Sequence, residues 1–492
     1  MQNNHIKLIT CVLFILLSQF AIGQHTTVKS IISGQLIGIP VNDQELYIEY
    51  NDIFTGKSYK YKPKVQADGS FHQLVRCSKK QEVSIYYNKT FKVILQPKDS
   101  IYVKITQKGK EINCLFKGDG KELNEELNLY LSNYYAKVTS KEKLDDAYRD
   151  KSYSEIARFA KKLNAKISKQ QMLFKQEVQC SEDMKIWLDA QLKYNYCSVL
   201  FNYPFNHMRL NKLRRGEWSV PAEYYSFVKE MPDISEQYYL HSELMTELIR
   251  GFSSYSTYAF TQKYGSNGVT LEMGNPEYLY MDIMLECMAD HPNIRQLVLG
   301  DHMHRKLSKN NVALYAELKT QLKENISDPI ILEGLNSHYQ SLTNGKVHSS
   351  VQLSKMKGAT YHQIIKEIVD KHPTQLIYVD LWATWCAPCI KAMKKAPSIH
   401  KKYAGEDISF VYLCLGSKEP DWNVVISKHH LHGNHYWLNS EQSGVVVNKL
   451  ETRLLPRYLV INNGEVVDAK EFSFSPSNPK TFELIDELLK KE

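Results

Sequence analysis

Two cysteines three positions apart constrain this chain more than any other feature. Cys386 and Cys389 follow the apolar run Leu376-Ile377-Tyr378-Val379, within the segment Trp382-Ala383-Thr384-Trp385-Cys386-Ala387-Pro388-Cys389. This order predicts a buried strand, a turn and a helix that begins near the first thiol, because Pro388 fits the first turn of a helix without breaking a hydrogen bond. Two thiols at such a turn are suited to reversible disulfide chemistry.

Metal binding is the alternative chemistry for this spacing. A closed structural zinc site needs four ligands, and the sequence has no second Cys-x-x-Cys or matching Cys/His pair. Four histidines lie close together, but a helix-end loop does not ensure convergent geometry, so an ordinary loop is expected. We expect redox-active thiols with no metal and no separate cofactor. The four histidines are His429, His430, His432 and His435.

Length and charge indicate a globular protein of several domains. The 492 residues are enough for about two to four folded units. Hydrophobic residues make up 43% of the chain and charged residues 24%, as in ordinary folded proteins. The formal net charge of +8 is spread thinly, without a Lys/Arg block or a basic helix with interleaved aromatic residues. Nucleic acid is therefore not an expected partner.

The N-terminus predicts export. Lys7 precedes an apolar stretch over residues 8–22 that is short for a membrane-spanning helix. Ala21-Ile22-Gly23 places small residues where a signal peptidase reads them. We expect a signal peptide over residues 1–23, cleaved before Gln24, with an uncleaved or lipid-anchored form as the alternative.

The remaining cysteines do not form a disulfide-dense scaffold. Cys11 lies in the predicted signal peptide. Cys77 and Cys114 could bridge two strands, whereas buried reduced thiols are the ordinary alternative. The sequence leaves open whether bridges form among Cys77, Cys114, Cys180, Cys197, Cys287 and Cys414.

Residues 24–118 are predicted to form an antiparallel β-sandwich. Apolar runs are separated by turn residues, and residues 101–105 alternate with a period of two. Gly56-Lys57-Ser58 resembles the end of a phosphate loop, but Asn51 stands at the required upstream glycine, so a hairpin turn is expected. The expected strands cover residues 31–36, 46–50, 71–75, 83–87, 91–95 and 101–105.

Residues 119–345 are predicted to form a helical region. Apolar and aromatic side chains recur at helical spacing from residue 123 to 134. Tyr255, Tyr258 and Tyr264 could form a glycan or peptide site, but aromatic residues at this spacing usually pack against neighbouring helices. We therefore expect these tyrosines to have a packing role.

Residues 346–492 are predicted to form an α/β domain, entered through a polar linker at about residues 343–351. A strand, a helix and a second buried strand form a right-handed βαβ unit with the thiols at its crossover. The expected elements are helices over residues 361–371, 386–403, 422–430 and 482–489, and strands over 376–382, 408–415, 435–438 and the two sides of the turn Asn463-Gly464.

This domain resembles a known family. The segment from Val379 to Cys389, followed some seventy residues later by Leu454-Leu455-Pro456-Arg457-Tyr458, is similar to the thioredoxin-fold domains of the TlpA/ResA type. The resemblance covers about residues 355–492. The front part resembles, more loosely, the β-sandwich and helical extensions that precede such domains in exported bacterial proteins. Together these imply a multidomain α+β protein that ends in an α/β thioredoxin fold.

The chemistry follows partly from the residues and partly from the resemblance. A helix start favours an anion, so Cys386 is predicted to be the attacking thiolate and Cys389 the resolving thiol. The resemblance places Asp380 beneath Cys389 as its proton acceptor, with a pKa raised by burial, and a hydrogen-bonded structural acid is the alternative. It also implies that the Leu455-Pro456 bond is cis, whereas an ordinary trans proline is the alternative.

Three residues are predicted to contact substrate. Trp385 lies at the rim of the motif, Leu455 offers its backbone to an extended segment, and Arg457 replaces the threonine that is usual in the family. The family's helix proline is also replaced by Lys394. Pro397 follows three residues later, which predicts a displaced bend.

The resemblance implies a periplasmic or cell-envelope thiol-disulfide oxidoreductase. Relatives with a signal peptide take electrons from a membrane thiol donor and reduce disulfides of envelope proteins, including apocytochrome c during cytochrome c maturation. A disulfide oxidase or isomerase is the alternative within this class. From another class, a binding or scaffold protein could use the thiols only to lock its conformation. The sequence does not indicate the oligomeric state.

Overall fold

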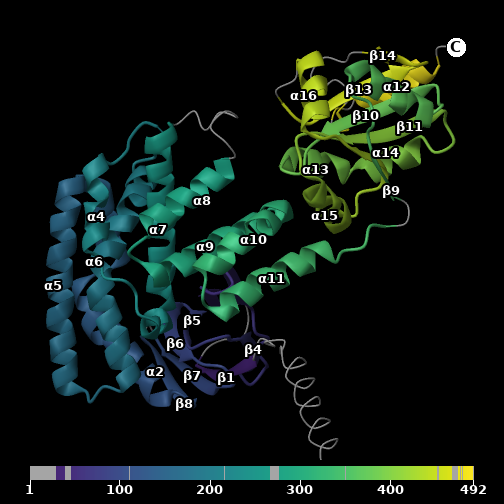
Figure 1. Cartoon of the computed structure of the whole chain (residues 1–492). Coiled ribbons are helices and arrows are strands. Elements are labelled where there is room, and N and C mark those ends of the chain that lie inside the picture. The colour runs from purple at the N-terminus through teal and green to yellow at the C-terminus, as the bar shows by residue number, and fades with distance from the viewer. Residues whose placement is uncertain are drawn as a thin grey trace, which may run out of the picture. The chain divides into compact units, whose positions relative to one another are not determined.

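The computed structural model divides the chain into two compact units. Residues up to 302 together with 322–334 form the first unit, and residues 303–321 together with 335–492 form the second. N-terminal strands, a helical middle and a C-terminal α/β region confirm the predicted α+β class (Figure 1). The predicted signal peptide lies outside the described residues, which are 29–38, 46–109, 111–214, 216–265, 276–348, 351–451, 454–467, 475–476, 478 and 480–490.

Two four-stranded sheets form a β-sandwich in the first unit. Their strand orders are β4-β1-β7-β8 and β3-β2-β5-β6. One pair departs from the predicted antiparallel pattern, because β1 and β7 run parallel. The strands are β1 (Lys29–Ile37), β2 (Tyr47–Asp52), β3 (Lys57–Tyr61), β4 (Ser70–Arg76), β5 (Gln81–Tyr87), β6 (Lys89–Leu95), β7 (Ser100–Lys108) and β8 (Glu111–Gly118).

Alternating side chains build the core of the sandwich. In β7, Ile101, Val103 and Ile105 are fully buried, whereas the residues between them are partly exposed. This is the period of two that a sheet with one covered face requires. Gly56, with φ of 60°, ends the turn of the β2–β3 hairpin, where the sequence predicts a turn. The strands β3 and β8 are not expected from the sequence, because neither carries a continuous apolar run.

Helices follow the sandwich, and α6 packs against both α5 and α7 in the first unit (Figure 1). Among the described residues, none of the helices is both long and apolar enough to cross a bilayer. The helices are α2 (Lys121–Tyr130), the π-helix η1 (Leu131–Tyr135), α3 (Ala136–Val138), α4 (Lys141–Asp150), α5 (Tyr153–Glu177), α6 (Glu182–Leu210), the 3-10 helices η2 (Ala222–Glu230) and η3 (Glu236–Leu240), α7 (Ser242–Tyr264), α8 (Pro276–Cys287), α9 (Pro292–Ser308), α10 (Val312–Asn325) and α11 (Pro329–Thr343).

The tyrosines of α7 pack against other aromatic rings. Tyr255 and Tyr258 lie with their ring centroids 4.9 and 5.1 Å from that of Tyr225. Tyr264 lies 5.0 Å from Phe260 on the same helix. These contacts agree with the packing role that helical spacing predicts.

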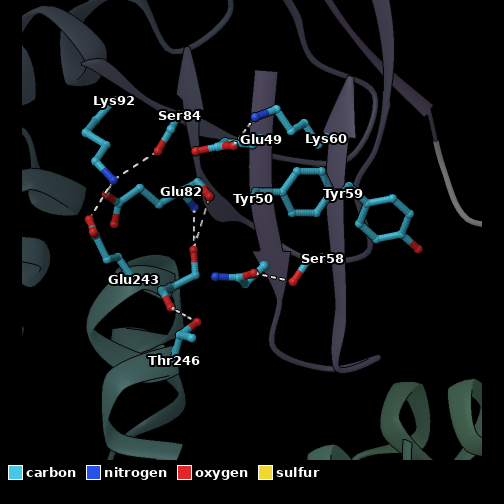
Figure 2. Close-up of a pocket in the computed structure, with 12 residues that line it drawn as sticks. Glu49, Tyr50, Ser58, Tyr59, Lys60, Glu82, Ser84, Lys92, Glu243 and Thr246 are labelled. Carbon is cyan, nitrogen blue, oxygen red and sulfur yellow. Dashed lines mark hydrogen bonds and ion pairs between the residues drawn. The ribbon is translucent and has the colours of Figure 1, made fainter. Parts of the chain in front are cut away.

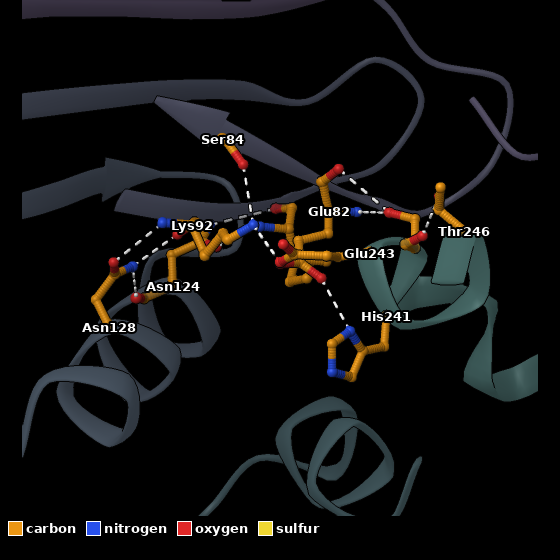
Figure 3. A network of polar contacts seen from close by, with 10 residues as sticks. Glu82, Ser84, Lys92, Asn124, Asn128, His241, Glu243 and Thr246 are labelled. Atoms are coloured by element: carbon orange, nitrogen blue, oxygen red, sulfur yellow. Dashed lines mark hydrogen bonds and ion pairs between the residues drawn. The ribbon is translucent and has the colours of Figure 1, made fainter. Parts of the chain in front are cut away.

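Two asparagine side chains of α2 complete the outer edge of β6 (Figure 3). The Asn124 amide accepts a hydrogen bond from the Ile94 N–H at 2.6 Å and donates one to the Ile94 carbonyl at 3.3 Å. Asn128 does the same for Lys92, at 3.1 and 2.6 Å. Residues four apart on a helix share a face, and residues two apart on a strand expose their backbone to the same side. The helix therefore supplies the hydrogen bonds that a neighbouring strand would make.

A charged network joins the same sheet to the start of α7 (Figure 3). Lys92 Nζ lies 3.1 Å from Glu82 Oε1 and 2.5 Å from Glu243 Oε2, and it donates to Ser84 Oγ at 3.0 Å. His241 Nδ1 lies 3.1 Å from the other oxygen of Glu82. Burial acts to raise the pKa of Glu82, but the charges of Lys92 and His241 outweigh it and hold that pKa below its usual range. Paired in this way, the buried charges fasten α7 to the sandwich.

Replacing Asn124 by Ala should destabilise the first unit, because the buried N–H and carbonyl of Ile94 lose their partners. We expect a loss of about 2 to 3 kcal/mol in the free energy of unfolding by urea, with faster amide exchange confined to β6. Asn113 is exposed on β8, and Asn113→Ala should cost less than about 0.5 kcal/mol. An Asn124→Ala variant with the parent's stability would show that the amide does not replace a strand.

The second unit contains a six-stranded sheet in the order β14-β13-β10-β11-β12-β9. The central strand β10 is parallel to β11 and antiparallel to β13. The strands are β9 (Val351–Lys355), β10 (Leu376–Trp382), β11 (Ile408–Cys414), β12 (Gly433–Trp437), β13 (Arg457–Asn462) and β14 (Glu465–Val467). The helices are α12 (Tyr361–Lys371), α13 (Ala387–Met393), α14 (Ala396–Lys402), α15 (Glu419–His429), α16 (Ser440–Lys449) and α17 (Lys480–Leu489).

Helices cover both faces of this sheet. On one face, Ile377, Val379 and Leu381 of β10 pack with apolar side chains of α12 and α16. On the other face, Trp382 packs with α13 and α15, and Tyr378 packs with α14 and α17. Because every residue of β10 is buried, the strand reads as a continuous apolar run apart from one acid.

The helix that follows the thiols is broken where the sequence predicts a displaced bend. It ends at Met393, and Pro397 lies in the first turn of α14. Helix α16 is not expected from the sequence. Its start nevertheless has a capping box, in which Asn439 accepts from the Gln442 N–H and the Gln442 side chain accepts from the Asn439 N–H.

The first half of α10 belongs to the second unit. Asp421 of α15 accepts a hydrogen bond from the Ala313 N–H at 2.9 Å, and Lys418 pairs with Glu317. Lys428 donates to Asn310 at 2.7 Å. Helix α15 is therefore covered by residues that lie well before the predicted linker in the sequence.

Candidate active site

Cys386 and Cys389 form a disulfide at the start of α13. Cys386 is the N-cap residue of this helix, and its Sγ accepts a hydrogen bond from the Cys389 N–H at 3.2 Å. Cys386 is 4% exposed and Cys389 is fully buried. A thiolate at Cys386 would keep the same N–H donor and lie nearer to solvent, so this sulfur suits the attacking role and Cys389 the resolving role.

Asp380 is the acid of the central strand, six residues before Cys386. It is 1% exposed, and burial raises its pKa well above the usual range. Its Oδ1 has no hydrogen-bond partner among the described residues. Burial therefore favours the neutral form of this carboxyl group, and Oδ1 is available to exchange a proton inside the domain.

The loop before β13 carries a cis peptide bond between Leu455 and Pro456. Leu455 packs against the core cluster that contains both thiols, which brings this loop to the site. Arg457 lies opposite Leu381 in the sheet and is 8% exposed, so its side chain is largely covered. Leu454, at the loop's outer side, is 57% exposed.

Trp385 and Trp382 have different surroundings although they are three residues apart. Trp385 is 68% exposed, and its indole N–H donates to the Gly416 carbonyl at 3.0 Å. Trp382 is fully buried in the core beneath the thiols. An exposed indole beside a reactive sulfur is suited to contact a partner protein.

The loop after β11 also shapes the site, and the sequence reasoning missed it. Ser417 Oγ accepts from the Thr384 N–H at 3.0 Å, and the Gly416 N–H donates to Ser443 Oγ at 3.0 Å. A usable signal was present, because β10 and β11 were both predicted as strands of a parallel sheet. The carboxyl ends of neighbouring parallel strands meet at one edge of a sheet, so the loops that follow them are neighbours.

The histidines after α15 do not gather into a cluster in the structure. Within the described ranges, no three or more His, Cys, Asp or Glu side chains are placed to hold a metal ion. His435 is fully buried on β12, with its ring stacked on Tyr412 at a centroid distance of 4.6 Å. His430 has φ of 49° and ends α15. Burial lowers the pKa of His435 to about 3, so this ring is neutral near pH 7.

The cysteines outside the motif that the structure describes carry free thiols. Cys77 and Cys114, considered as a possible bridge, are both unpaired, and burial raises the pKa of each to about 12. Cys414 is buried beside the active-site strand, and burial likewise raises its pKa to about 12. Thiols with such pKa values are poor nucleophiles at neutral pH. The other free cysteines are Cys180, Cys197 and Cys287.

A polar pocket of about 350 Å³ lies in the first unit, between the sheet of β2, β3 and β5 and the helix α7 (Figure 2). At its upper side in this view Glu49 Oε2 lies 3.7 Å from Lys60 Nζ. Lys92 is shared between Glu82 and Glu243 at its other side. The charged residues that line this pocket thus pair with one another, and the Lys92–Glu243 pair joins the sheet to α7.

Comparison with known proteins agrees with this geometry. Residues 374–466 match a family described as thioredoxin-like. A thiol-disulfide oxidoreductase from Bacteroides vulgatus is 30% identical over 25% of this chain and 78% of its own, with a TM-score of 0.23. A thioredoxin-related protein from Neisseria meningitidis serogroup B is 18% identical over 24% and 87% of the two chains (TM-score 0.21), and StoA from Bacillus subtilis is 17% identical over 23% and 82% (TM-score 0.19). No curated protein matches the chain.

The C-terminal region therefore belongs to the thioredoxin-like family.

Replacing His435 by Phe should reduce the sensitivity of the second unit to acid. The unfolded chain binds a proton at this residue below about pH 6.5, whereas the folded chain does so only below about pH 3. Its contribution to stability is therefore present above pH 6.5 and is lost as the pH falls. We expect the parent to lose about 3 kcal/mol more than the variant between pH 7 and pH 4, measured by urea unfolding.

Val411→Ala, at a neutral buried position of β11, is the control for this experiment. It should lower the free energy of unfolding by a similar amount at both pH values. A His435→Phe variant that loses as much stability on acidification as the parent would contradict the expectation.

Replacing Asp380 by Asn should stabilise the folded protein at alkaline pH. The unfolded chain releases the Asp380 proton near pH 4, but the folded chain retains it to higher pH, so stability is lost as the pH rises above about 4. The amide does not titrate. We expect Asp380→Asn to raise the free energy of unfolding by at least about 1 kcal/mol at pH 8 and by less at pH 4. Asp370→Asn, at an exposed site on α12, should change it by less than about 0.5 kcal/mol.

Proposed function

We propose that this protein is an exported thiol-disulfide oxidoreductase that reduces disulfides of proteins in the periplasm or cell envelope. The observation that carries the proposal is the Cys386–Cys389 disulfide at the start of a helix, beside the cis Leu455-Pro456 bond and at the end of the strand that buries Asp380. This combination provides a nucleophile, a resolving thiol and an internal acid within one site. We propose no metal and no organic cofactor, since the two thiols can carry the electrons themselves.

In the proposed reaction the reduced protein transfers two electrons to a substrate disulfide. The Cys386 thiolate attacks one substrate sulfur, a mixed disulfide forms, and the first substrate thiolate leaves and takes a proton from solvent. Asp380 first loses its proton to solvent, and the carboxylate takes the proton of Cys389, whose sulfur then attacks Cys386 Sγ. The mixed disulfide breaks, the second substrate thiolate leaves and takes a proton, and the Cys386–Cys389 disulfide is restored. The substrate is thereby reduced and the protein is oxidised.

The surface around the sulfurs supports a protein as the substrate. Trp385 and Leu454 are large, exposed apolar side chains on the two loops that flank the disulfide. An extended polypeptide could lie across them and pair with the backbone of Leu455, while its disulfide meets Cys386. A membrane-bound dithiol is the proposed electron donor, since each turnover leaves the pair oxidised. Apocytochrome c is one candidate substrate among envelope proteins, by the resemblance stated above.

Replacing Cys389 by Ala in residues 24–492 should trap substrates, because the mixed disulfide through Cys386 cannot be resolved. We expect non-reducing electrophoresis of envelope extract to show disulfide-linked complexes that disappear when a reductant is added. Reduction of a model protein disulfide by the variant should fall at least about 100-fold below that of the parent. Cys414→Ala, which removes a buried thiol outside the motif, should trap nothing and retain activity.

The proposal is wrong if Cys389→Ala captures no protein and the parent cannot reduce a model disulfide. A purely conformational role for the thiols, as in a scaffold protein, would give that result. The reduction potential of the parent then separates the directions within the enzyme class. A value near about −270 mV supports a reductase, whereas one near about −120 mV supports an oxidase.

A further inference from the structure

The exposed face of α13, the helix that follows the reactive thiol, is basic. From residue 381 to residue 405 the sequence contains five lysines and no Asp or Glu. Ala387, Pro388 and Lys391 of α13 are exposed, and so are Lys394 and Lys395 at its end. Residues three or four apart on a helix share a face. The lysine face, formed by these three lysines, therefore starts one turn beyond the two residues that separate the thiols.

The lysine face carries net positive charge. Among the described residues, neither Lys391 nor Lys394 takes part in an ion pair. The positive charge continues onto the end of α15, which packs with α13. Burial first, and then the charges of Lys394 and Lys428, lower the pKa of His429, so these three side chains lie near one another. Like charges on one surface repel one another, and a partner with negative charge would reduce that repulsion.

A protein that reacts with Cys386 must cover the lysine face. The substrate sulfur has to reach Cys386, which is 4% exposed. Even a transient redox encounter buries about 500 Å² on each partner, which is a patch roughly 25 Å across. Lys391 follows Cys386 by about 8 Å along the helix axis, since an α-helix rises about 1.5 Å per residue. A patch of that size centred on the thiol therefore includes the start of the lysine face.

We propose that the lysine face selects substrate proteins that carry acidic residues beside the disulfide they present to Cys386. The inference rests on the proposed function, because it names the substrate class of the same redox site. Trp385 and Leu454, which are exposed and apolar, carry no charge and cannot distinguish an acidic segment from a neutral one. The lysines add that preference, so they determine specificity and take no part in the exchange of the sulfurs.

The range of the interaction defines which substrate residues matter. An extended chain advances about 3.4 Å per residue, so the three residues on either side of the substrate cysteine lie within about 10 Å of it. Exposed charges interact over about the same distance at an ionic strength of about 0.1 M. Attraction of this kind mainly raises the rate of association, and salt weakens it.

The experiment uses the reduced full chain and two oxidised peptides that differ only in charge. Each peptide has one internal disulfide, which is flanked by three glutamates in the first peptide and by three glutamines in the second. A single turnover is stopped with acid, and the reduced and oxidised peptides are separated by chromatography. We expect the parent to reduce the glutamate peptide about tenfold faster at about 20 mM salt, and to lose most of this difference at about 500 mM salt.

Reversing the charge of the lysine face should remove this preference. In the double variant Lys391→Glu with Lys394→Glu, we expect the glutamate peptide to react no faster than the glutamine peptide at low salt. The double variant Lys391→Arg with Lys394→Arg keeps the charge and should keep the parent's ratio. The ratio of the two rates is the readout, because a change in the reactivity of Cys386 itself alters both rates equally.

Two exposed lysines elsewhere on the same unit provide a matched control. Lys449 is on α16, which packs on the other face of the sheet. Lys357 lies beside the same helix, where Gln442 donates hydrogen bonds to the carbonyls of Met356 and Gly358. Lys357→Glu with Lys449→Glu changes the net charge by the same amount and should leave the ratio within about twofold of the parent's.

Three results would overturn the inference. The first is a parent that reduces both peptides at equal rates. The second is a charge-reversed variant that keeps the parent's ratio or slows both peptides equally, which would place the effect on Cys386 instead of the substrate. The third is a parent without peptide preference that binds phosphatidylglycerol vesicles while the charge-reversed variant does not, since the lysine face would then dock on a membrane.

The same experiment separates this inference from the proposed function. If the parent reduces neither peptide, the proposed reductase activity fails. If it reduces both peptides at equal rates, the proposed function stands and only the preference for acidic substrates is wrong.

Discussion

The C-terminal unit depends on the burial of one carboxyl group in the central strand of its mixed sheet. Asp380 interrupts a strand in which every residue is buried. Burial disfavours an ionised carboxylate there and raises its pKa, and the residues opposite it on the neighbouring strands are the phenols Tyr412 and Tyr458 rather than charged groups. The strand ends at the turn before Cys386. Asp380, whose charged form burial disfavours most, thus lies near the thiols, where the proposed disulfide exchange needs a proton to move.

The first unit depends on a different kind of contact. Its sandwich has an apolar core, but the helices meet its second sheet through amide hydrogen bonds and ion pairs. Such contacts contribute little net free energy to folding. Removing only one partner of a contact is nevertheless costly, because the other partner is left buried and unpaired. They therefore favour one arrangement of α2 and α7 on the sheet over others. The paired charges also occupy the walls of the pocket beside α7, which explains its polarity without a ligand (Figure 2).

Sequence periodicity predicted the elements with strong local patterns. The helix over residues 361–371 and the strand over 376–382 coincide with the structure, because both have clear caps or apolar runs. The strand β3 and the helix α16 were missed, since polar residues dominate them and their partners are distant in sequence. For the site, the motif gave the thiols and the resemblance gave Asp380. Contacts between separate elements, such as that of Tyr412 with His400, leave no local pattern in a single sequence.

The helix that lies along β6 has a consequence for how the protein meets other chains. An exposed strand edge offers unpaired N–H and carbonyl groups to which a foreign strand can add. At β6 the amides of Asn124 and Asn128 already occupy the groups of Ile94 and Lys92. An added strand would expose a new row of backbone N–H and carbonyl groups, whereas the helix does not. A strand from another chain therefore cannot pair with β6 at these residues. The helix α2 thereby reduces the tendency of this side of the sandwich to aggregate.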